Sequence, residues 1–349
     1  MSILDIENQF VLNKQYESKL IIDGSDSALP LVSIMIPTYR RPDLLREAID
    51  SVLKQKTNVI FEVVVVDNET DICFSNKVDA IIRQFNDGRI RLFRNSKNIG
   101  MFGNWNRCIE LARSEWVSIL NDDDLFKINF IEIAFDSLNK NKNINLLFAR
   151  SEFIDERGSN FKKFLNRLKQ NIKKINLVTL TGNISKISTE DIFLDPLCNA
   201  LAMLFRREFA ISIGGFKESA YPSADYVFFV MYHLKFGTYR LNKYLAYYRI
   251  HENETAQPST GEGFISKNLE LRRQLENVID WPKIFMRLYA QLYALRTINQ
   301  YKTFWKVNLD LNKIKKDNEL PEIPVNPFYL IVRYILRFCF FSKNLLKKN

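Results

Sequence analysis

The chain has 349 residues, of which 46% are hydrophobic and 13% are aromatic. This size and composition suit one large folded domain with an appendage, and they exclude a disordered or fibrous protein. The formal net charge is +10, and residues 267–349 carry most of it, with 16 Lys and Arg against 7 Asp and Glu. A basic tail rich in Phe, Tyr, Leu and Trp fits an anionic membrane surface at least as well as a polynucleotide.

The first half of the chain alternates predicted strands and helices. In chain order these are strand 32–36, helix 44–53, strand 61–66, helix 72–85, strand 90–93, helix 104–112 and strand 116–120. Strand 61–66 is apolar almost throughout, which is typical of a central parallel strand covered on both faces. The alternation predicts an α/β fold with a doubly wound, mostly parallel sheet and helices on both faces. Ligands of such sheets bind at the carboxyl ends of the strands.

The second half is less regular. Residues 151–195 break the alternation, and we expect the Lys- and Asn-rich stretch 162–174 to be a variable surface excursion. The following predicted elements are strand 200–205, a turn at 214–216, helix 225–235, strand 244–250 and, from about residue 270, a C-terminal extension of amphipathic helices. The apolar stretch 328–341 is too short to span a bilayer, so no transmembrane helix is predicted.

Targeting and redox signals are also weak. The first residues lack the basic cluster and apolar run of a secretory signal, so export is not expected. The four cysteines lie far apart without the spacing of a zinc knuckle or a disulfide framework. A reducing, cytoplasmic compartment is the natural interpretation.

Polar residues follow three of the predicted strands at the edge where ligands are expected. The segments are Pro37-Thr38-Tyr39-Arg40-Arg41, Asp67-Asn68-Glu69 and Asn121-Asp122-Asp123-Asp124. Adjacent carboxylates repel each other, so the three aspartates need a cation or several hydrogen-bond donors. Hard oxygen ligands suit Mg²⁺ or Mn²⁺. For this motif in isolation, a solvated acidic turn that caps the next helix is the alternative.

These motifs, in this order, resemble those of the family-2 glycosyltransferases with the GT-A fold. The resemblance runs from Val32 to about His251. The segment 32–39 looks like the family's first strand and nucleotide-binding turn, and 64–68 looks like its second. Residues 98–104 are similar to its donor-binding loop and the helix that follows, and 120–124 resemble its Asp-any-Asp metal motif.

The resemblance implies roles for individual residues. Those expected to contact a nucleotide sugar are Pro37, Thr38, Tyr39, Arg41, Asp67, Asn98, Gly100, Asn104, Asn121 and Asp122. Asp123 and Asp124 are expected to bind the Mn²⁺ or Mg²⁺ cofactor. Asn121 stands at the first acidic position of the family motif, and Asp122 or Asp124 would have to compensate. Judged singly, Thr38, Tyr39 and Arg41 are ordinary turn residues.

Two motifs further along the chain complete the resemblance. Gly214-Gly215-Phe216 followed by 222–226 looks like the family's Gly-Gly-Phe turn and acceptor-site acidic pair, with Ala224 in place of the usual Glu. Asp225 is then the general base, and a helix N-cap is the alternative. Residues 248–251 look like the family's Tyr-Arg-any-His strand end, which implies that His251 reaches the metal or the diphosphate. A hydrogen-bonded structural histidine is the alternative.

The resemblance also implies an organisation and an activity. We expect an N-terminal extension (1–30), a GT-A domain (31–265) with a nucleotide-sugar half (31–125) and an acceptor half (126–265), and a basic helical extension (266–349). The expected enzyme is inverting and moves a sugar from a nucleotide-diphosphate sugar to an acceptor hydroxyl. Its setting would be surface polysaccharide or lipid-linked glycan synthesis, so the acceptor partner would be a glycan or a lipid-linked glycan.

The basic C-terminal tail bears on where the protein is located, and the absence of other nucleotide-binding motifs bears on which other protein classes are possible. Residues from about Pro324 onward are expected to lie on the inner face of the cell membrane, or else to pack against the catalytic domain or a second copy. A non-catalytic nucleotide-sugar-binding relative and a nucleic-acid-binding protein remain alternatives, although no nucleic-acid partner is expected. An NAD-dependent enzyme is disfavoured because no G-x-G-x-x-G follows the first strand.

Overall fold

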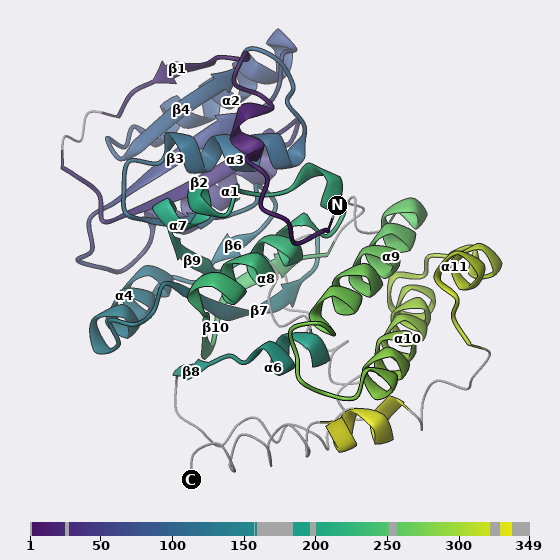
Figure 1. The fold of residues 1–349 in the computed structure, drawn as a ribbon. Helices are drawn as coiled ribbons and strands as arrows, with labels where there is room; N and C mark the ends of the chain where they lie inside the picture. The colour runs from purple at the N-terminus through teal and green to yellow at the C-terminus, as the bar shows by residue number, and fades with distance from the viewer. Residues whose placement is uncertain are drawn as a thin grey trace.

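The computed structural model describes residues 2–24, 28–156, 158, 184–195, 200–250, 257–321 and 329–336 (Figure 1). The strands are β1 (Ser18–Ile22), β2 (Val32–Thr38), β3 (Phe61–Asp67), β4 (Ile90–Asn95), β5 (Trp116–Ile119), β6 (Leu125–Phe126), β7 (Leu146–Ile154), β8 (Ile184–Lys186), β9 (Met203–Arg206) and β10 (Tyr239–Arg249). The longer helices are α1 (Pro42–Leu53), α2 (Ile72–Phe85), α3 (Met101–Leu111), α4 (Phe130–Lys140), α8 (Ala224–Phe236), α9 (Pro258–Leu275), α10 (Lys283–Gln300) and α11 (Leu311–Asn318). Shorter helical segments are η1 (Gln9–Val11), α6 (Thr189–Leu194), α7 (Arg207–Ser212), η3 (Glu218–Ala220) and the π-helical turn η5 (Tyr301–Trp305).

All of these strands join one ten-stranded sheet, in the order β1-β4-β3-β2-β5-β9-β7-β10-β6, with β8 paired to β10. The neighbours β4, β3, β2 and β5 pair in parallel, with Val32 opposite both Phe61 and Trp116. β7 and β10 form a second parallel pair. β9 lies antiparallel between β5 and β7, so it joins the two parallel parts into one sheet.

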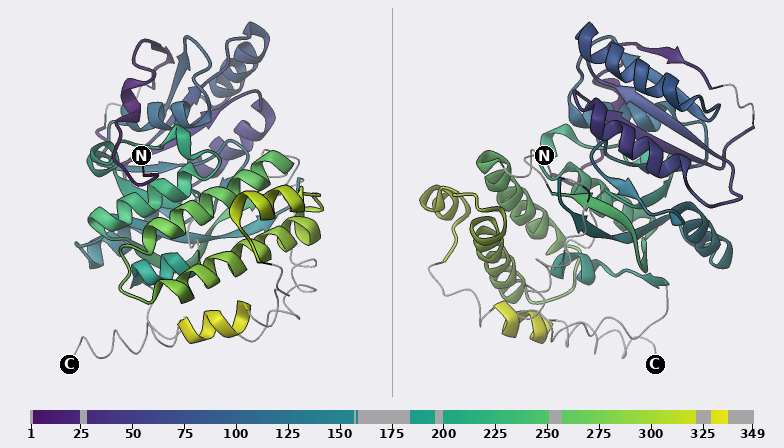
Figure 2. Two further views of the ribbon diagram at one scale, coloured as in Figure 1. Left: turned by 45° about the vertical axis from the view of Figure 1, so that its right-hand side comes forward. Right: turned by 180° about the vertical axis from the view of Figure 1, so that it is seen from behind.

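Helices cover both faces of the sheet because successive side chains of a buried strand point to opposite faces. In β2, Ile34 and Ile36 pack in one core with α1, α2 and α4, while Met35 packs in a second core with α3 and α8. Figure 1 shows α3 and α8 on the near face, and the rear view in Figure 2 shows the purple and blue helices α1 and α2 on the other. The expected α/β class, with helices on both faces, is confirmed.

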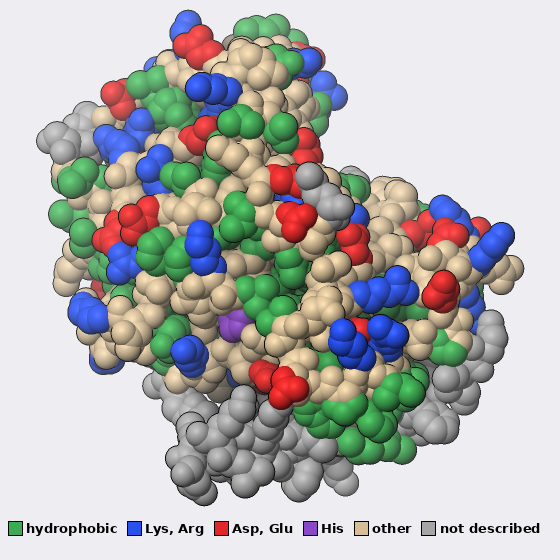
Figure 3. Space-filling model, viewed as in Figure 1, with side chains coloured by type: hydrophobic (Ala, Val, Ile, Leu, Met, Phe, Trp, Pro, Cys, Tyr) green, Lys and Arg blue, Asp and Glu red, His purple; other side chains and the backbone are tan. Residues whose placement is uncertain are grey.

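The C-terminal helices α9 and α10 lie side by side and continue the second core (Figures 1 and 2). Leu275, Met286 and Tyr289 share that core with Phe193 and Phe228. The expected helical extension is therefore present, and it packs on the sheet domain. Hydrophobic side chains also gather on the surface at the start of α10 (Figure 3).

Several expected elements differ in their bounds. The helix expected at 72–85 is α2, whereas strand 244–250 begins earlier, at Tyr239, and strand 200–205 is the shorter β9. β7 has no counterpart among the predicted elements, because no strand was predicted between the acidic turn at 121–124 and the irregular stretch at 151–195. The expected surface excursion at 162–174 lies outside the described residues. Within the described part of the chain, no helix is both long and apolar enough to cross a membrane.

Candidate active site

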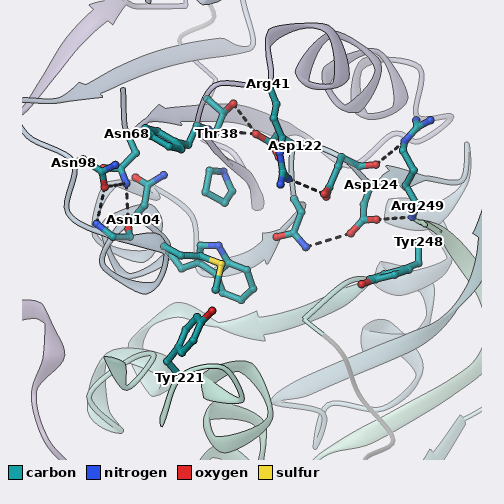
Figure 4. A pocket seen from close by; sticks show the side chains of 17 residues that line it. Thr38, Arg41, Asn68, Asn98, Asn104, Asp122, Asp124, Tyr221, Tyr248 and Arg249 are labelled. Atoms are coloured by element: carbon teal, nitrogen blue, oxygen red, sulfur yellow. Dashed lines mark hydrogen bonds and ion pairs between the residues drawn. The ribbon is translucent and has the colours of Figure 1, made fainter. Parts of the chain in front are cut away.

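A cavity of about 440 Å³ lies at the carboxyl ends of β2 and β5, beside the N-terminus of α3 (Figure 4). The turns after β2 and β5, the loop before α3, the segment before α8 and the end of β10 all contribute to it. The lining residues are Pro37, Thr38, Tyr39, Arg41, Asn68, Asn98, Gly100, Met101, Asn104, Trp105, Asn121, Asp122, Asp123, Asp124, Tyr221, Tyr248 and Arg249. The cavity is therefore where a parallel sheet is expected to bind a ligand.

The turn after β5 is tied to the turn after β2 through its first two aspartates. Asp122 accepts hydrogen bonds from the Thr38 hydroxyl at 2.8 Å and from the Tyr39 backbone N–H at 3.3 Å. The Arg41 guanidinium lies 2.8 Å from the Asp123 carboxylate and 3.4 Å from that of Asp122. These contacts bring together the first and third of the strand-end motifs that the sequence indicated (Figure 4).

The third aspartate is held from the opposite side, by β10. The Asp124 carboxylate accepts hydrogen bonds from the Arg249 backbone N–H at 2.9 Å and from the Asn121 amide at 3.2 Å. The buried Arg249 guanidinium donates to the Asp123 carbonyl at 2.9 Å and pairs with Glu47 of α1 at 2.6 Å. Arg249 thus fixes both the backbone and a side chain of the acidic turn.

The acidic turn brings buried carboxyl groups close together. Burial raises the pKa of Asp122 to about 6, with repulsion from Asp123 adding to the rise, and Arg41 and Thr38 oppose it. Burial, again with repulsion from Asp123, also raises the pKa of Asp124. A divalent cation would relieve this crowding of carboxylates. Within the described residues, no cluster of three or more His, Cys, Asp or Glu side chains is arranged to hold a metal by itself.

The donor chemistry nevertheless fits Mg²⁺ or Mn²⁺. Such ions favour oxygen ligands, and Mg²⁺ is commonly held by one or two carboxylates together with phosphate groups of a bound ligand. Asp123 and Asp124 lie on the cavity, as expected of metal-binding residues. His251, the third expected ligand, lies outside the described residues.

The other side of the cavity is built from asparagines. Asn68, at the end of β3, donates to the Asn98 side chain at 2.9 Å and to the Gly100 carbonyl at 3.2 Å, and it accepts from the Ile99 N–H at 3.0 Å. Asn104 donates to the Val66 carbonyl at 3.0 Å. These bonds hold the loop before α3 against the strand end. Gly100 has φ +76°, a backbone conformation that residues other than glycine rarely adopt.

Aromatic side chains form the remaining wall. Trp105 of α3 packs edge to face on Phe102, with ring centres 5.5 Å apart, and on Phe216 at 5.1 Å. Phe102 in turn packs edge to face with Tyr221, at 6.3 Å. Trp105 is almost fully buried, whereas Tyr221 is exposed at the mouth of the cavity. The cavity therefore combines an acidic side, an amide side and an apolar wall.

Two expected site residues lie elsewhere. Asp67 does not line the cavity, because its buried carboxylate turns toward Arg94, 2.9 Å away. Burial raises the pKa of Asp67, and Arg94 opposes that rise. Asp225, in the first turn of α8, is not among the lining residues either, although Tyr221 just before it is. Burial raises the pKa of Asp225 to about 6.

The sequence reasoning missed six lining residues: Asn68, Met101, Trp105, Tyr221, Tyr248 and Arg249. Most of them lie within or beside a motif that the sequence analysis identified. Their closeness to these motifs along the chain is the signal that could have identified them. Asn68 follows Asp67, and Arg249 precedes His251 in the strand-end motif. Nothing in the sequence distinguishes Tyr221 from other surface tyrosines.

Comparison with known proteins gives a consistent result. The model of the family "Glycosyl transferase family 2" matches residues 33–192. An uncharacterised glycosyltransferase of Methanocaldococcus jannaschii is 33% identical over 138 residues, which are 39% of this chain and 46% of that protein. The Escherichia coli UDP-Glc:alpha-D-GlcNAc-diphosphoundecaprenol beta-1,3-glucosyltransferase WfgD is 30% identical over 125 residues, 36% of this chain and 47% of that protein. The chain therefore spans about half the length of each of these relatives.

Solved structures show the same fold at low sequence identity. The crystal structure of S. aureus TarS in complex with UDP-GlcNAc has a TM-score of 0.55 at 16% identity, covering 78% of this chain and 73% of that one. The mannosyltransferase PcManGT from Pyrobaculum calidifontis, in complex with GDP-Man and Mn²⁺, has a TM-score of 0.54 at 16% identity, covering 95% and 91%. The expected GT-A fold is confirmed. The model of glycosyl transferase family 2 thus matches residues 33–192, and these residues lie in a domain with the fold of these solved structures.

Proposed function

We propose that this protein is an inverting glycosyltransferase that moves a sugar from a nucleotide-diphosphate sugar to an acceptor hydroxyl. The observation that carries the proposal is the convergence of three strand-end motifs on one cavity with an acidic side and an amide side. Relatives named as glycosyltransferases support it, as do similar folds solved with UDP-GlcNAc and with GDP-Man.

The donor has a natural orientation in this cavity. Its diphosphate would lie next to the acidic turn, because a bound cation there would compensate both sets of negative charge. Its nucleoside would lie toward the amide side, where Asn68, Asn98 and Asn104 border the cavity. Tyr39, exposed at the rim, offers a ring face for stacking on the base.

A divalent metal, Mn²⁺ or Mg²⁺, would be held by Asp123 with Asp124. When bound, it would supply Lewis-acid stabilisation of the charge that develops on the departing diphosphate. Arg41 lies 2.8 Å from Asp123 and places a fixed positive charge beside the same position. Thr38 and Arg249 keep the acidic turn in place from its two sides.

The acceptor hydroxyl needs a base. Asp225 is our candidate, since a carboxyl with a pKa of about 6 is ionised at neutral pH and still accepts a proton readily. The acceptor oxygen would attack the anomeric carbon from the face opposite the diphosphate while its proton passes to Asp225. Such a direct displacement inverts the anomeric configuration.

We propose a glycan or lipid-linked glycan as the acceptor, in the synthesis of a surface polysaccharide. The support comes from WfgD, whose name specifies a sugar-diphosphoundecaprenol acceptor. The alternative within the same family is a non-catalytic relative that binds a nucleotide sugar without transferring it. The two functions share the donor cavity and differ only in turnover.

The decisive experiment screens UDP-, GDP- and dTDP-sugars with Mn²⁺ by thermal unfolding, and then follows slow hydrolysis of each stabilising sugar. A ligand at 100 times its Kd stabilises the folded state by about 2.7 kcal/mol, which is readily measured. We expect one nucleotide class to stabilise the protein and to be hydrolysed. Stabilisation without hydrolysis or transfer would identify the non-catalytic relative, and no stabilisation by any donor would refute the proposal.

A further inference from the structure

The helix formed by residues 329–336 has two apolar faces, and the domain covers only one of them. Tyr329 is 2% exposed and Leu336 is 1% exposed, and both belong to the core that contains α8 and α10. The Tyr329 ring stacks on Tyr289 with ring centres 5.6 Å apart, and Arg333 pairs with Asp195. This face fixes the helix on the domain, which agrees with the expectation that the segment packs against the catalytic domain.

The opposite face of the helix is open. Leu330, Ile331, Tyr334 and Ile335 follow the spacing i, i+1, i+4, i+5, which places them on one side of a helix. All four are exposed, with Ile331 at 54% and Ile335 at 52%. A helix that is apolar all round is normally buried all round. Its open side therefore indicates a partner.

The start of α10 extends this open face. Ile284 is 74% exposed, and Phe285 and Val278 are also exposed. Phe285 lies one helical turn before Tyr289, the residue on which Tyr329 stacks, so the two apolar groups are neighbours. Figure 3 shows the hydrophobic side chains gathered there, with Lys and Arg side chains above them and Asp or Glu side chains to their left. Single exposed apolar residues are ordinary, but a contiguous group of this kind marks an interaction site.

Basic side chains border this apolar group. Arg273, Lys283 and Arg287 are exposed on the neighbouring ends of α9 and α10, and Asp280 is the exposed acidic residue between them. Arg287 also pairs with the buried Glu276 at 3.0 Å. The sequence that follows, residues 337–349, contains four Lys or Arg and no Asp or Glu. A two-fold contact between copies would bring this positive rim against itself, because the same surface is used on both sides. The charge therefore favours an anionic partner.

We propose that Val278, Ile284, Phe285, Leu330, Ile331, Tyr334 and Ile335 form a docking surface for an anionic lipid bilayer. The apolar side chains would enter the headgroup region, and the basic rim would meet the lipid phosphates. The 329–336 helix would lie in the plane of the interface. This surface is separate from the donor cavity, and its docking does not depend on sugar transfer.

The test is co-sedimentation of the full chain with vesicles of phosphatidylcholine alone and of phosphatidylcholine with 30% phosphatidylglycerol. The variant Ile331→Gln/Ile335→Gln removes the two most exposed apolar side chains of the helix. The matched control, Leu20→Gln/Ile72→Gln, changes two exposed apolar residues of β1 and α2, at the opposite end of the molecule (Figure 1). Equal melting temperatures would show that both variants fold.

We expect the full chain and the control to sediment with the anionic vesicles at low salt and to be released at high salt. The partition coefficient of the Ile331/Ile335 variant should fall at least about tenfold, because apolar insertion and charge act together. Equal sedimentation of the two variants, or equal sedimentation with both vesicle types, would overturn the proposal. A dimer in light scattering that the Ile331/Ile335 variant alone disrupts would assign the surface to a second copy.

Discussion

At the scale of single residues, the acidic turn is the most constrained part of the site. Asp122, Asp123 and Asp124 are consecutive, yet their carboxylates take donors from three directions: Thr38, Arg41 and the end of β10. A turn that merely caps a helix would not need this many partners. The arrangement instead holds three carboxylates close together in one place, with Arg41 as the nearest positive charge.

Asp123→Ala should reduce turnover by about 10³-fold or more, because it removes a carboxylate ligand and leaves the charge of the diphosphate poorly compensated. Stabilisation of the protein by Mn²⁺ with the donor should disappear with it. Asp136→Ala, an exposed aspartate of α4 that pairs with Lys140, is the control. Unchanged turnover in Asp123→Ala, or in wild type with excess chelator, would contradict the assignment.

Asp225→Asn should lower turnover roughly 10²–10⁴-fold while donor affinity changes little, because the amide cannot accept the acceptor's proton. The Asp225 carboxylate accepts a hydrogen bond from the Tyr226 N–H at 2.8 Å, and an Asn oxygen retains it. Steady-state kinetics and donor titration separate the two effects. Loss of donor binding together with turnover would place Asp225 in the donor site or in the folding of α8.

The pH dependence of stability tests the same carboxyl independently. Its folded pKa of about 6 lies above the ordinary value of 3.8, so the folded protein holds this proton more tightly than the unfolded chain does. The contribution of this group to the free energy of unfolding is greatest below pH 3.8. It is lost as the pH rises to about 6, and the total loss is up to about 3 kcal/mol. Asp225→Asn should therefore raise the melting temperature at pH 8 but not at pH 4. An equal effect at both values would show that the carboxyl is not strained by burial.

The sequence predicted eleven of the lining residues, and its errors have a simple cause. Side chains at a strand end alternate between the two faces of the sheet. Asp67 and Asn68 are adjacent, and only the folded structure shows that Asp67 turns toward Arg94 while Asn68 borders the cavity. Tyr221 comes from a distant segment, so its position depends on packing that local patterns do not encode.

At the scale of elements, the Gly-Gly-Phe turn at 214–216 connects α8 to α3, the helix that borders the cavity. Asn106 of α3 donates to the Phe216 carbonyl at 2.9 Å and accepts from the Phe216 N–H at 2.7 Å. Phe216 then packs on Trp105 and, stacked at 4.2 Å, on Phe228 of α8. The turn thus sets α3 and α8 relative to each other.

Gly215→Ala should destabilise the fold by roughly 2–4 kcal/mol, since its φ of +81° disfavours a side chain and the added methyl would collide with Asn106. Chemical denaturation measures the loss. Gly237→Ala is a matched control: its φ is also positive, at +71°, but the new methyl would meet only the flexible end of Lys186. A loss no larger than that of the control would show that the contact with Asn106 is unimportant.

Local pattern predicted the elements of the parallel part of the sheet well, because alternating strands and helices are also neighbours in space. It predicted no strand at β7, and it did not predict the antiparallel place of β9 in the sheet. β9 lies antiparallel between β5 and β7, and this pairing joins segments about 50 to 90 residues apart in the sequence. Local sequence patterns do not encode such long-range pairing, so only the structure shows how β5, β9 and β7 pair at the centre of the sheet.

At the scale of the whole molecule, the sheet domain and the C-terminal helices share one core. Arg272 of α9 is buried, donates to the Phe193 carbonyl at 3.0 Å and lies over the Tyr293 ring at 3.9 Å. Tyr289 and Leu275 belong to the same cluster as Phe228. The helices therefore complete the fold of the domain that carries the site.

A chain that ends at residue 265 should consequently fail to fold as a soluble catalytic domain, because it exposes the core side chains that α9 and α10 cover. Expression, gel filtration and circular dichroism of the shortened chain check this. A chain that ends at residue 321 retains those helices and is the comparison. A stable, monomeric chain ending at 265 would show that the sheet domain is autonomous.

The position of Trp105 has a practical consequence for measurement. Its indole lines the cavity from within an almost fully buried aromatic cluster, so a ligand entering the cavity changes the polarity and the quenching around this one fluorophore. Among the tryptophan side chains that the structure describes, Trp116 and Trp281 do not line the cavity and should give a constant background. Intrinsic fluorescence should therefore report nucleotide-sugar binding without any label, and Trp105→Phe should abolish the signal. The protein contains its own optical probe, placed where the chemistry is expected.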